Sequence, residues 1–262
     1  MNQPCAICDA RMDEVFSATV LSRHAVSYYR CARCGLLQTE APYWLDEAYR
    51  EPIAAADTGL IQRNFSLAAR LSAVLYSCLD PRGAYLDVAG GYGMLVRLMR
   101  DIGFDFYWHD QHCENVLARG FEAAGAGRKF SALTAFEVLE HVPDPVRFVS
   151  DLLQQHDVRT LIFSTQTYAG NLPPRDWWYY AFETGQHISF YQARTLATLA
   201  ERLGLHFLSA NGLHVMTDRP AQFGRLKLLT GLLAYPAAVY VRRRLGSKTV
   251  SDHLALLRAA PR

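Results

Sequence analysis

Four of the six cysteines stand in two C-x-x-C pairs near the N-terminus, an arrangement that binds metal ions. Cys5 and Cys8 form the first pair, and Cys31 and Cys34 form the second pair in "CARCG". Four thiolates from two such pairs match the closed tetrahedral site of a structural zinc ion, which leaves no position for a substrate. A redox role for one pair is the alternative, although neither pair lies in a βαβ pattern. We therefore expect a structural Zn²⁺ at these four cysteines.

The segment between the two cysteine pairs predicts a short β-hairpin. Its sequence, "VFSATVLSRHAVSYYR" (15–30), is rich in β-branched and aromatic residues. Gly35 follows the second pair, where a tight turn needs a residue without a Cβ atom. Residues 1–40 are therefore expected to form a small zinc-ribbon-like module.

A second group of residues combines a carboxylate with glycines. In "LDVAGGYG" (86–93), Asp87 ends a buried strand and stands before the glycines, and a helical pattern follows. Glycines allow a ligand to approach the backbone closely, and the helix N-terminus supplies N–H donors. The G-x-G-x-x-G and GK[ST] signatures of dinucleotide and P-loop sites are absent. Asp87 in this place suits a ligand with an amino group or a positive charge, and the alternative is a turn or helix-capping acid.

The segments around this loop predict the elements that position it. A second strand, "FDFYWHD" (104–110), ends in Asp110, an acid that can bind two ribose hydroxyls at roughly 20 residues after the glycine loop. "FSALTAFEVLEHVPDP" (130–145) indicates a strand and an acidic turn, 158–167 another buried strand, and 192–210 a helix followed by a strand. We expect an α/β fold with a doubly wound, Rossmann-like sheet over residues 83–218.

A connector and a tail flank this predicted core. The connector, 41–82, begins with aromatic residues and ends in a helical pattern whose apolar side chains should share one face, namely Ile61, Phe65, Ala68, Ala69 and Leu71. Weaker candidates for a substrate site are Tyr43, Trp44, Tyr49, Asp57, Thr58 and Arg63 in the connector, and Thr165, Gln166 and Tyr168 in and after the strand at 158–167. The tail, 219–262, is apolar and then basic around Arg242–Arg244. It predicts helices that pack on the core, or alternatively a peripheral contact with anionic membrane lipids.

"LDVAGGYG", the acid at the end of the second strand and "FEVLEHVPDP" together resemble the class I S-adenosylmethionine-dependent methyltransferases, over about residues 80–215. The resemblance implies the cofactor S-adenosyl-L-methionine. It places Asp110 at the ribose with Gln111 beside it, and Phe136 and Glu137 along the cofactor cleft. The residues that it places around the methionine part are Asp87, Ala89, Gly90, Gly91 and Gly93.

The cysteine module before this core makes the chain similar to bacterial sugar methyltransferases that carry a four-cysteine zinc module. In the sugar C-methyltransferases, a run like H-E-H-x-x-Y-F lines the substrate site after the fifth strand. This chain has "GQHISFY" (185–191), in which His187 matches the second histidine, Gln186 replaces the glutamate and Gly185 replaces the first histidine. This departure leaves open whether the mechanism and substrate of the C-methyltransferases apply here.

His187 is the candidate general base of the predicted reaction. Methyl transfer from a sulfonium is an in-line displacement, and a hydroxyl acceptor loses its proton to a group such as histidine. A structural histidine is the alternative. His141 in "EVLEHV" is a second catalytic candidate that, with Glu140, could instead only cap the next segment. The aromatic run "WWYY" (177–180) suits a sugar ring, or otherwise a lid or packing cluster.

Composition bounds these expectations. The chain has 262 residues and a net charge of +2, which gives no electrostatic basis for binding nucleic acid. Its N-terminus lacks an apolar run after a basic start, so the expected compartment is the cytoplasm. The expected function is methyl transfer to oxygen or carbon of a sugar, in a nucleotide sugar or glycan. The alternatives are O-methylation of a small natural product, and a non-catalytic zinc interaction module. The sequence gives no indication of oligomeric state.

Overall fold

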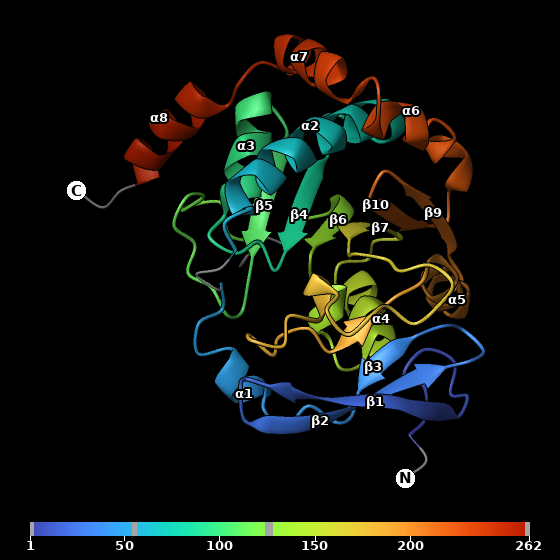
Figure 1. Cartoon of the computed structure of the whole chain (residues 1–262). Coiled ribbons are helices and arrows are strands. Elements are labelled where there is room, and N and C mark those ends of the chain that lie inside the picture. The colour runs from blue at the N-terminus through green and yellow to red at the C-terminus, as the bar shows by residue number, and fades with distance from the viewer. Residues whose placement is uncertain (1–2, 54–56, 124–127, 260–262) are drawn as a thin grey trace.

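The structure is a computed structural model that describes residues 3–53, 57–123 and 128–259. Two β-sheets organise it, a six-stranded sheet in the centre and a four-stranded sheet at one end (Figure 1).

The central sheet has the strand order β5-β4-β6-β7-β10-β9. The first four strands in this order are parallel, whereas β10 pairs antiparallel with both neighbours. This order confirms the predicted α/β class with a doubly wound sheet, in which loops after parallel strands meet at one edge. The strands are β4 (Ala84–Val88), β5 (Asp105–His109), β6 (Phe130–Phe136), β7 (Thr160–Ser164), β9 (His206–Ala210) and β10 (Leu213–Thr217).

Helices cover both faces of this sheet. One core joins the sheet to α2, α3, α6 and α7, and another joins its opposite face to α4 and α5. The second core also contains the four-cysteine module, so the module shares apolar packing with the sheet. The helices are α2 (Leu60–Cys78), α3 (Met94–Ile102), α4 (Pro145–Gln155), α5 (Ala193–Arg202), α6 (Leu226–Thr230), α7 (Ala234–Leu245) and α8 (Thr249–Ala259).

The apolar face expected on α2 is correct only in its middle. Ala68, Ala69 and Leu71 are buried, but Ile61 and Phe65 are 61% and 56% exposed. The buried face of α2 continues through Val74 and Leu75 instead. The first two turns therefore leave Ile61 and Phe65 open to solvent, a difference that periodicity alone does not reveal.

The four-stranded sheet has the order β1-β2-β3-β8. The predicted hairpin is present as β1 (Met12–Val20) and β2 (His24–Cys31). β3 (Leu37–Thr39) pairs with β2 and with β8 (Ser189–Phe190), a strand that belongs to the region expected as the core. The N-terminal module and the core are thus joined within one sheet. The remaining short elements are α1 (Leu45–Ala48) and the 3-10 turns η1 (Leu139–His141), η2 (Trp178–Tyr180) and η3 (Pro220–Phe223).

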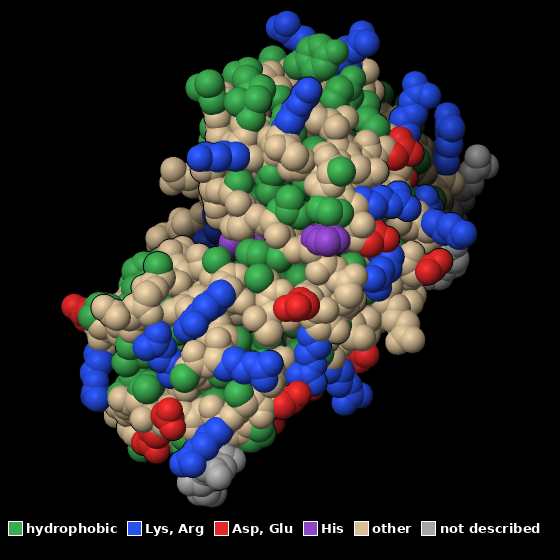
Figure 2. Space-filling view, turned by 90° about the vertical axis from the view of Figure 1, so that its right-hand side faces the viewer, with side chains coloured by type: hydrophobic (Ala, Val, Ile, Leu, Met, Phe, Trp, Pro, Cys, Tyr) green, Lys and Arg blue, Asp and Glu red, His purple; other side chains and the backbone are tan. Residues whose placement is uncertain are grey.

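The tail forms α6, α7 and α8, which pack over α2 and α3 (Figure 1). Asp252 of α8 is buried and accepts hydrogen bonds of 2.8 Å from both Nε and Nη2 of Arg100. Figure 2 shows hydrophobic side chains among Lys and Arg at the top of the molecule, over α6 and α7. Among the described residues, no helix has both the length and the apolar character needed to cross a bilayer.

Replacing Asp252 by alanine should destabilise the protein by about 3 kcal/mol, because it removes one partner of a buried ion pair and leaves Arg100 undercompensated. Equilibrium urea unfolding measures this change in the free energy of unfolding. Asp151→Ala is the matched control, since Asp151 pairs with Arg147 on the exposed face of α4. Equal, small effects of both substitutions would contradict a stabilising role of the α8 contact.

Candidate functional site

The four cysteines of the N-terminal module converge on one point. Their sulfur atoms all lie within 4.8 Å of one another, with 3.4 Å between Cys5 and Cys34 and 3.5 Å between Cys8 and Cys31. Gly35 has φ +81°, as its tight turn requires, and its N–H donates to the carbonyl of Cys31. Four sulfurs at this spacing fit a tetrahedral zinc ion, whose sulfur–sulfur edge is about 3.8 Å for bonds of ~2.3 Å.

The module is fixed to the core by polar contacts of its two cysteine turns. Arg202 of α5 donates to the carbonyl of Ile7 at 2.7 Å, and Thr195 donates to the carbonyl of Cys34 at 2.8 Å. The hydroxyl of Tyr168 donates to the carbonyl of Gly35 at 2.5 Å. Tyr168, expected as a substrate contact, therefore links the two parts of the protein.

The glycine loop follows β4, and Asp87 lies beneath it. Oδ1 of Asp87 accepts a 2.6 Å hydrogen bond from Thr134 of β6. The Asp87 side chain is almost fully buried, and this burial raises its pKa to about 7, with the nearby charge of Asp110 adding to the shift. A Cβ atom on Gly90 would lie 3.1 Å from Oδ2 of Asp87 and 2.8 Å from the Trp108 ring, so only glycine fits there.

The backbone of the loop is held from the side of β5. Oδ2 of Asp110 accepts from the N–H of Gly91 at 2.9 Å, and Nε1 of Trp108 donates to the carbonyl of Gly91 at 2.9 Å. Gly91 and Gly93 have positive φ angles, and so does Ala89 at +55°, a conformation that costs a residue with a side chain more than it costs glycine. Gln111 is exposed beside Asp110. The structure thus brings together the residues expected around the cofactor on this side.

A second cluster follows β6, the strand next to β4. Glu140 and His141 lie in η1, and His187 precedes β8, with 4.8 Å between the centroids of the two imidazole rings. The N–H of Ile188 donates to the carbonyl of Glu140 at 2.8 Å, which fixes the two segments against each other. Glu137, with φ +53°, accepts a short hydrogen bond from Ser164, and Phe136 is half-buried at the end of β6. The two catalytic candidates are therefore neighbours.

Burial shifts the pKa values of this cluster in the directions that favour the neutral forms. Desolvation raises the pKa of Glu140 to about 8, and the charge of Glu137 adds to the rise. Desolvation lowers the pKa of His141 to about 3, with a further contribution from His187. The pKa of His187 is also lowered by burial. Both histidines are therefore neutral at pH 7.

The sequence around His187 is hydrogen-bonded to the connector. Nε2 of Gln186 donates to the carbonyl of Ala48 at 2.9 Å, and Nε1 of Trp44 donates to the carbonyl of Gly185 at 2.8 Å. Gly185 has φ +65°, and a Cβ atom there would lie 2.7 Å from Val20. The backbone at position 185 therefore requires glycine, and the amide of Gln186 supplies a donor that a carboxylate could not.

Tyr49, beside α1, joins the two halves of the site. Its ring stacks on His112 at 4.9 Å and lies 6.2 Å from the His141 ring. Burial raises the pKa of Tyr49, and the charges of Glu140 and Asp110 raise it further. Tyr49 is therefore placed between the acid after β5 and the cluster after β6.

The other weak candidates divide between structural and open positions. Trp44 is buried, Tyr43 is exposed, and Arg63 is paired with Asp57 at 2.6 Å. Thr165 and the backbone N–H of Gln166 contact the hydroxyl of Tyr179, and Thr58 is exposed. In the aromatic run, Tyr179 and Tyr180 are buried and Trp177 packs against them, whereas Trp178 is 73% exposed. Most of the run is thus a packing cluster, with Trp178 open to a ligand.

Two residues near the site carried no signal in the sequence. Trp108 supports the glycine loop, and Thr134 orients Asp87. Tyr179 belongs to the aromatic run noted in the sequence, but its hydrogen bond to Oε1 of Glu140 at 2.6 Å was not expected. Trp108 and Thr134 lie within ordinary strand patterns, so only their pairing with the neighbouring strand reveals these roles.

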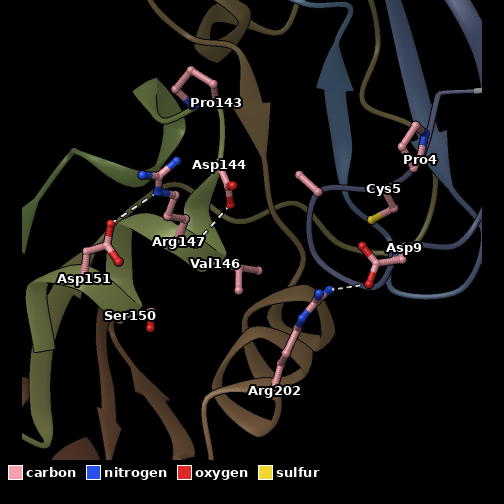
Figure 3. A pocket seen from close by; sticks show the side chains of 11 residues that line it. Pro4, Cys5, Asp9, Pro143, Asp144, Val146, Arg147, Ser150, Asp151 and Arg202 are labelled. Atoms are coloured by element: carbon pink, nitrogen blue, oxygen red, sulfur yellow. Dashed lines mark hydrogen bonds and ion pairs between the residues drawn. The ribbon is translucent and has the colours of Figure 1, made fainter. Parts of the chain in front are cut away.

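A separate groove lies between the cysteine module and α4 (Figure 3). Asp144, Arg147 and Asp151 line one side of it, and Asp9 with Arg202 closes another. Its side chains pair with each other across 2.8 Å for Arg202 and Asp9 and 3.4 Å for Arg147 and Asp151. None of the residues expected at the cofactor or acceptor site lines this groove.

Residues 58–210, more than half of the chain, match the family described as "Methyltransferase domain". The chain belongs to this family. The match favours methyl transfer over the alternative of a non-catalytic interaction module. Among curated proteins, none matches the chain in sequence.

Solved structures that are similar to part of the chain include several methyltransferases. PigF with bound S-adenosylhomocysteine is 14% identical, with a TM-score of 0.48 over 68% of this chain and 63% of that chain. TnmH is 18% identical, with a TM-score of 0.44 over 67% and 60%. CalO1, a methyltransferase in calicheamicin biosynthesis with bound S-adenosylhomocysteine, is 13% identical, with a TM-score of 0.43 over 65% and 60%. The chain thus covers less than two thirds of each of these proteins.

Proposed function

We propose that the protein transfers the methyl group of S-adenosylmethionine to a hydroxyl of a small sugar-type acceptor, free, nucleotide-linked or within a glycan. One observation carries this proposal. The glycine loop with Asp87 and the cluster with His141 and His187 follow the adjacent parallel strands β4 and β6, so they share one edge of the sheet. O-methylation of a natural-product hydroxyl uses the same geometry and is the second candidate, and transfer to carbon is the third.

In this mechanism the cofactor supplies a methyl group already activated on a sulfonium. Asp87 and the backbone of residues 89–93 hold its methionine part, and Asp110 with Gln111 holds the ribose. Phe136 and Glu137 line the cleft beside it. When bound, the cofactor would supply a methyl group that passes from its sulfur to the acceptor oxygen, with S-adenosylhomocysteine as the second product. The hydroxyl proton passes to Nε2 of His187, with His141 beside it.

His187 supports this role through the orientation of its ring. Its Nδ1 lies 2.7 Å from the carbonyl of Tyr179, so Nδ1 carries the hydrogen and Nε2 keeps a free lone pair. Nε2 of His187 is therefore fixed in position as the proton acceptor before the substrate binds. The exposed Trp178 supplies an aromatic face near this loop for a sugar ring.

His187→Ala should lower turnover about a hundredfold or more, because it removes the proton acceptor. The measurement is transfer of radiolabelled methyl groups to a panel of nucleotide sugars, glycans and phenols. His206→Ala, on the exposed edge strand β9, is the control and should be fully active. Affinity for S-adenosylhomocysteine should stay unchanged in both variants, and unaltered turnover in His187→Ala would rule out the base.

Binding of S-adenosylhomocysteine should strengthen about tenfold between pH 6 and pH 8, because Asp87 must ionise to pair with the amino group. Its pKa near 7 leaves the carboxyl mainly protonated at pH 6, so binding there releases a proton. Calorimetry in buffers of different ionisation enthalpy counts this proton. In Asp87→Asn the pH dependence should vanish and binding should be weaker. A pH-independent wild type would disprove the pairing.

The four cysteines are proposed to hold one structural zinc ion. Removing one ligand in Cys31→Ser should lower the zinc content by one ion per chain, because three thiolates no longer close the site. Inductively coupled plasma mass spectrometry of protein purified without chelator gives the content. Cys113→Ser, outside the module, should keep the wild-type value. Equal zinc contents of all three proteins would refute the assignment.

The outer face of α6 and α7 supports a peripheral membrane contact as part of the proposed function. Leu232, in the turn between the two helices, is 83% exposed and Tyr235 of α7 is 64% exposed, with Arg242 and Arg243 further along α7. Apolar side chains beside arginines suit insertion at an anionic lipid surface. The inner face of α7 packs on α2, as the alternative of a packing tail requires. The cytoplasm stays the expected compartment.

Vesicles that contain phosphatidylserine should sediment the protein at low salt and release it at high salt, because the arginines contribute attraction that salt screens. The double substitution Arg242→Glu, Arg243→Glu should abolish sedimentation. Arg119→Glu, a charge reversal at an exposed site elsewhere, is the control. Protein that stays in the supernatant with every vesicle composition would end the membrane proposal.

A further inference from the structure

Three side chains of metal-binding type converge at the candidate base. One ligand atom from each of Glu140, His141 and His187 lies within 4.8 Å of those of the other two. Two of these residues are adjacent in η1, and the third comes from the loop before β8. The 2.8 Å hydrogen bond from the N–H of Ile188 to the carbonyl of Glu140 keeps the loop and the turn in register. The cluster is therefore built by the fold, and its members do not lie on one mobile segment.

Both imidazole rings are oriented in the way that metal ligands require. Nδ1 of His187 lies 2.7 Å from the carbonyl of Tyr179, and Nδ1 of His141 lies 3.1 Å from the carbonyl of Gln186. A carbonyl only accepts, so each Nδ1 carries a hydrogen and each Nε2 offers a lone pair. Backbone carbonyls that bind the second ring nitrogen are the usual outer partners of metal-bound histidines. Neither Nε2 has a hydrogen-bond partner among residues 3–53, 57–123 and 128–259.

Only one of the two carboxyl oxygens of Glu140 has a hydrogen-bond partner in the described part of the chain. Oε1 accepts from Tyr179 at 2.6 Å, whereas Oε2 is buried without a partner within the described part of the chain. An unpaired buried carboxylate oxygen costs free energy and requires an explanation, of which a bound ion is one. Each of the three residues thus has one ligand atom without a hydrogen-bond partner in the described part of the chain, and the three residues bring ligand atoms within 4.8 Å of one another.

We propose that Glu140, His141 and His187 bind a divalent first-row transition metal through one carboxylate oxygen and the two Nε2 atoms. Imidazole and carboxylate ligands suit Mn²⁺, Fe²⁺, Co²⁺ and Zn²⁺, and two histidines with one carboxylate leave coordination positions open. The site therefore differs from the four-cysteine site, whose soft thiolates form a closed coordination sphere.

The consequence for catalysis rests on the proposed function, although the metal site itself does not. An acceptor hydroxyl at an open position loses its proton more easily, because the cation stabilises the oxygen anion. A metal bound there would occupy Nε2 of His187, so the role of His187 as the base would apply to the metal-free protein. In the metal-bound protein the cation would activate the hydroxyl, and the proton would pass to water. More than one open position would favour an acceptor with oxygens on neighbouring carbons, such as the adjacent hydroxyls of a sugar.

Titration of the zinc-loaded protein with Co²⁺ tests the site directly. One equivalent should bind and give weak visible absorption without the strong near-ultraviolet band of cobalt–thiolate bonds. Glu140→Gln keeps a partner for Tyr179 but removes the charge, and His187→Ala removes one ligand. Each should weaken Co²⁺ binding by at least about tenfold, while His206→Ala binds as the wild type does.

Three outcomes would overturn the proposal: no Co²⁺ binding by the wild type, thiolate absorption alone, or equal binding by all variants. Circular dichroism and the affinity for S-adenosylhomocysteine, measured on the same samples, report folding and cofactor binding separately. Cobalt binding without methyl transfer would count against the proposed acceptor and leave the metal site standing. Failure of the folded wild type to bind S-adenosylhomocysteine would count against the proposed function alone.

Discussion

The pairing of β3 with β8 is the constraint on which the candidate site depends. Only two residue pairs form this ladder, Leu37 with Phe190 and Gln38 with Ser189. Two residues before Ser189 stands His187, so the position of the imidazole follows from the edge of the cysteine module's sheet. The N–H of Thr39 extends the contact to the carbonyl of Ile188 at 3.0 Å, and Ile188 in turn donates to Glu140. The four-cysteine module therefore helps to set the positions of His187 and Glu140.

The glycine loop and the cluster after β6 each contain a buried carboxyl group. Asp87 and Glu140 are both buried carboxyls whose pKa values are raised by desolvation. Each has one oxygen bound to a hydroxyl, from Thr134 and from Tyr179 respectively. Ionising a buried carboxyl of this kind costs free energy because the charge is desolvated, and a bound cation offsets that cost. An amino group on one side and a metal ion on the other are the partners that the two proposals assign.

The sequence was sufficient for the features that local pattern determines. The cysteine spacing predicted the convergence of four sulfurs, and the strand–glycine–helix run predicted the position of Asp87 beneath its loop. Contacts between distant segments were beyond it. Nothing near Ser189 in sequence indicates a partner at Gln38, and the unpartnered oxygen of Glu140 exists only because Tyr179 packs beside it. The exposure of Ile61 and Phe65 escaped prediction for the same reason, since it depends on which distant segments pack against α2.

The shared sheet also bears on how this protein can be recombined. β8 is encoded about 150 residues after β3, yet the two strands form one hydrogen-bonded edge, and aromatic residues of both regions, such as Tyr28 and Phe190, occupy one core. A chimera that exchanged the cysteine module alone would present a foreign edge to β8 and a foreign surface to that core. The module and the loop around His187 must therefore be exchanged together, although strands β4 to β7 lie between them in the sequence.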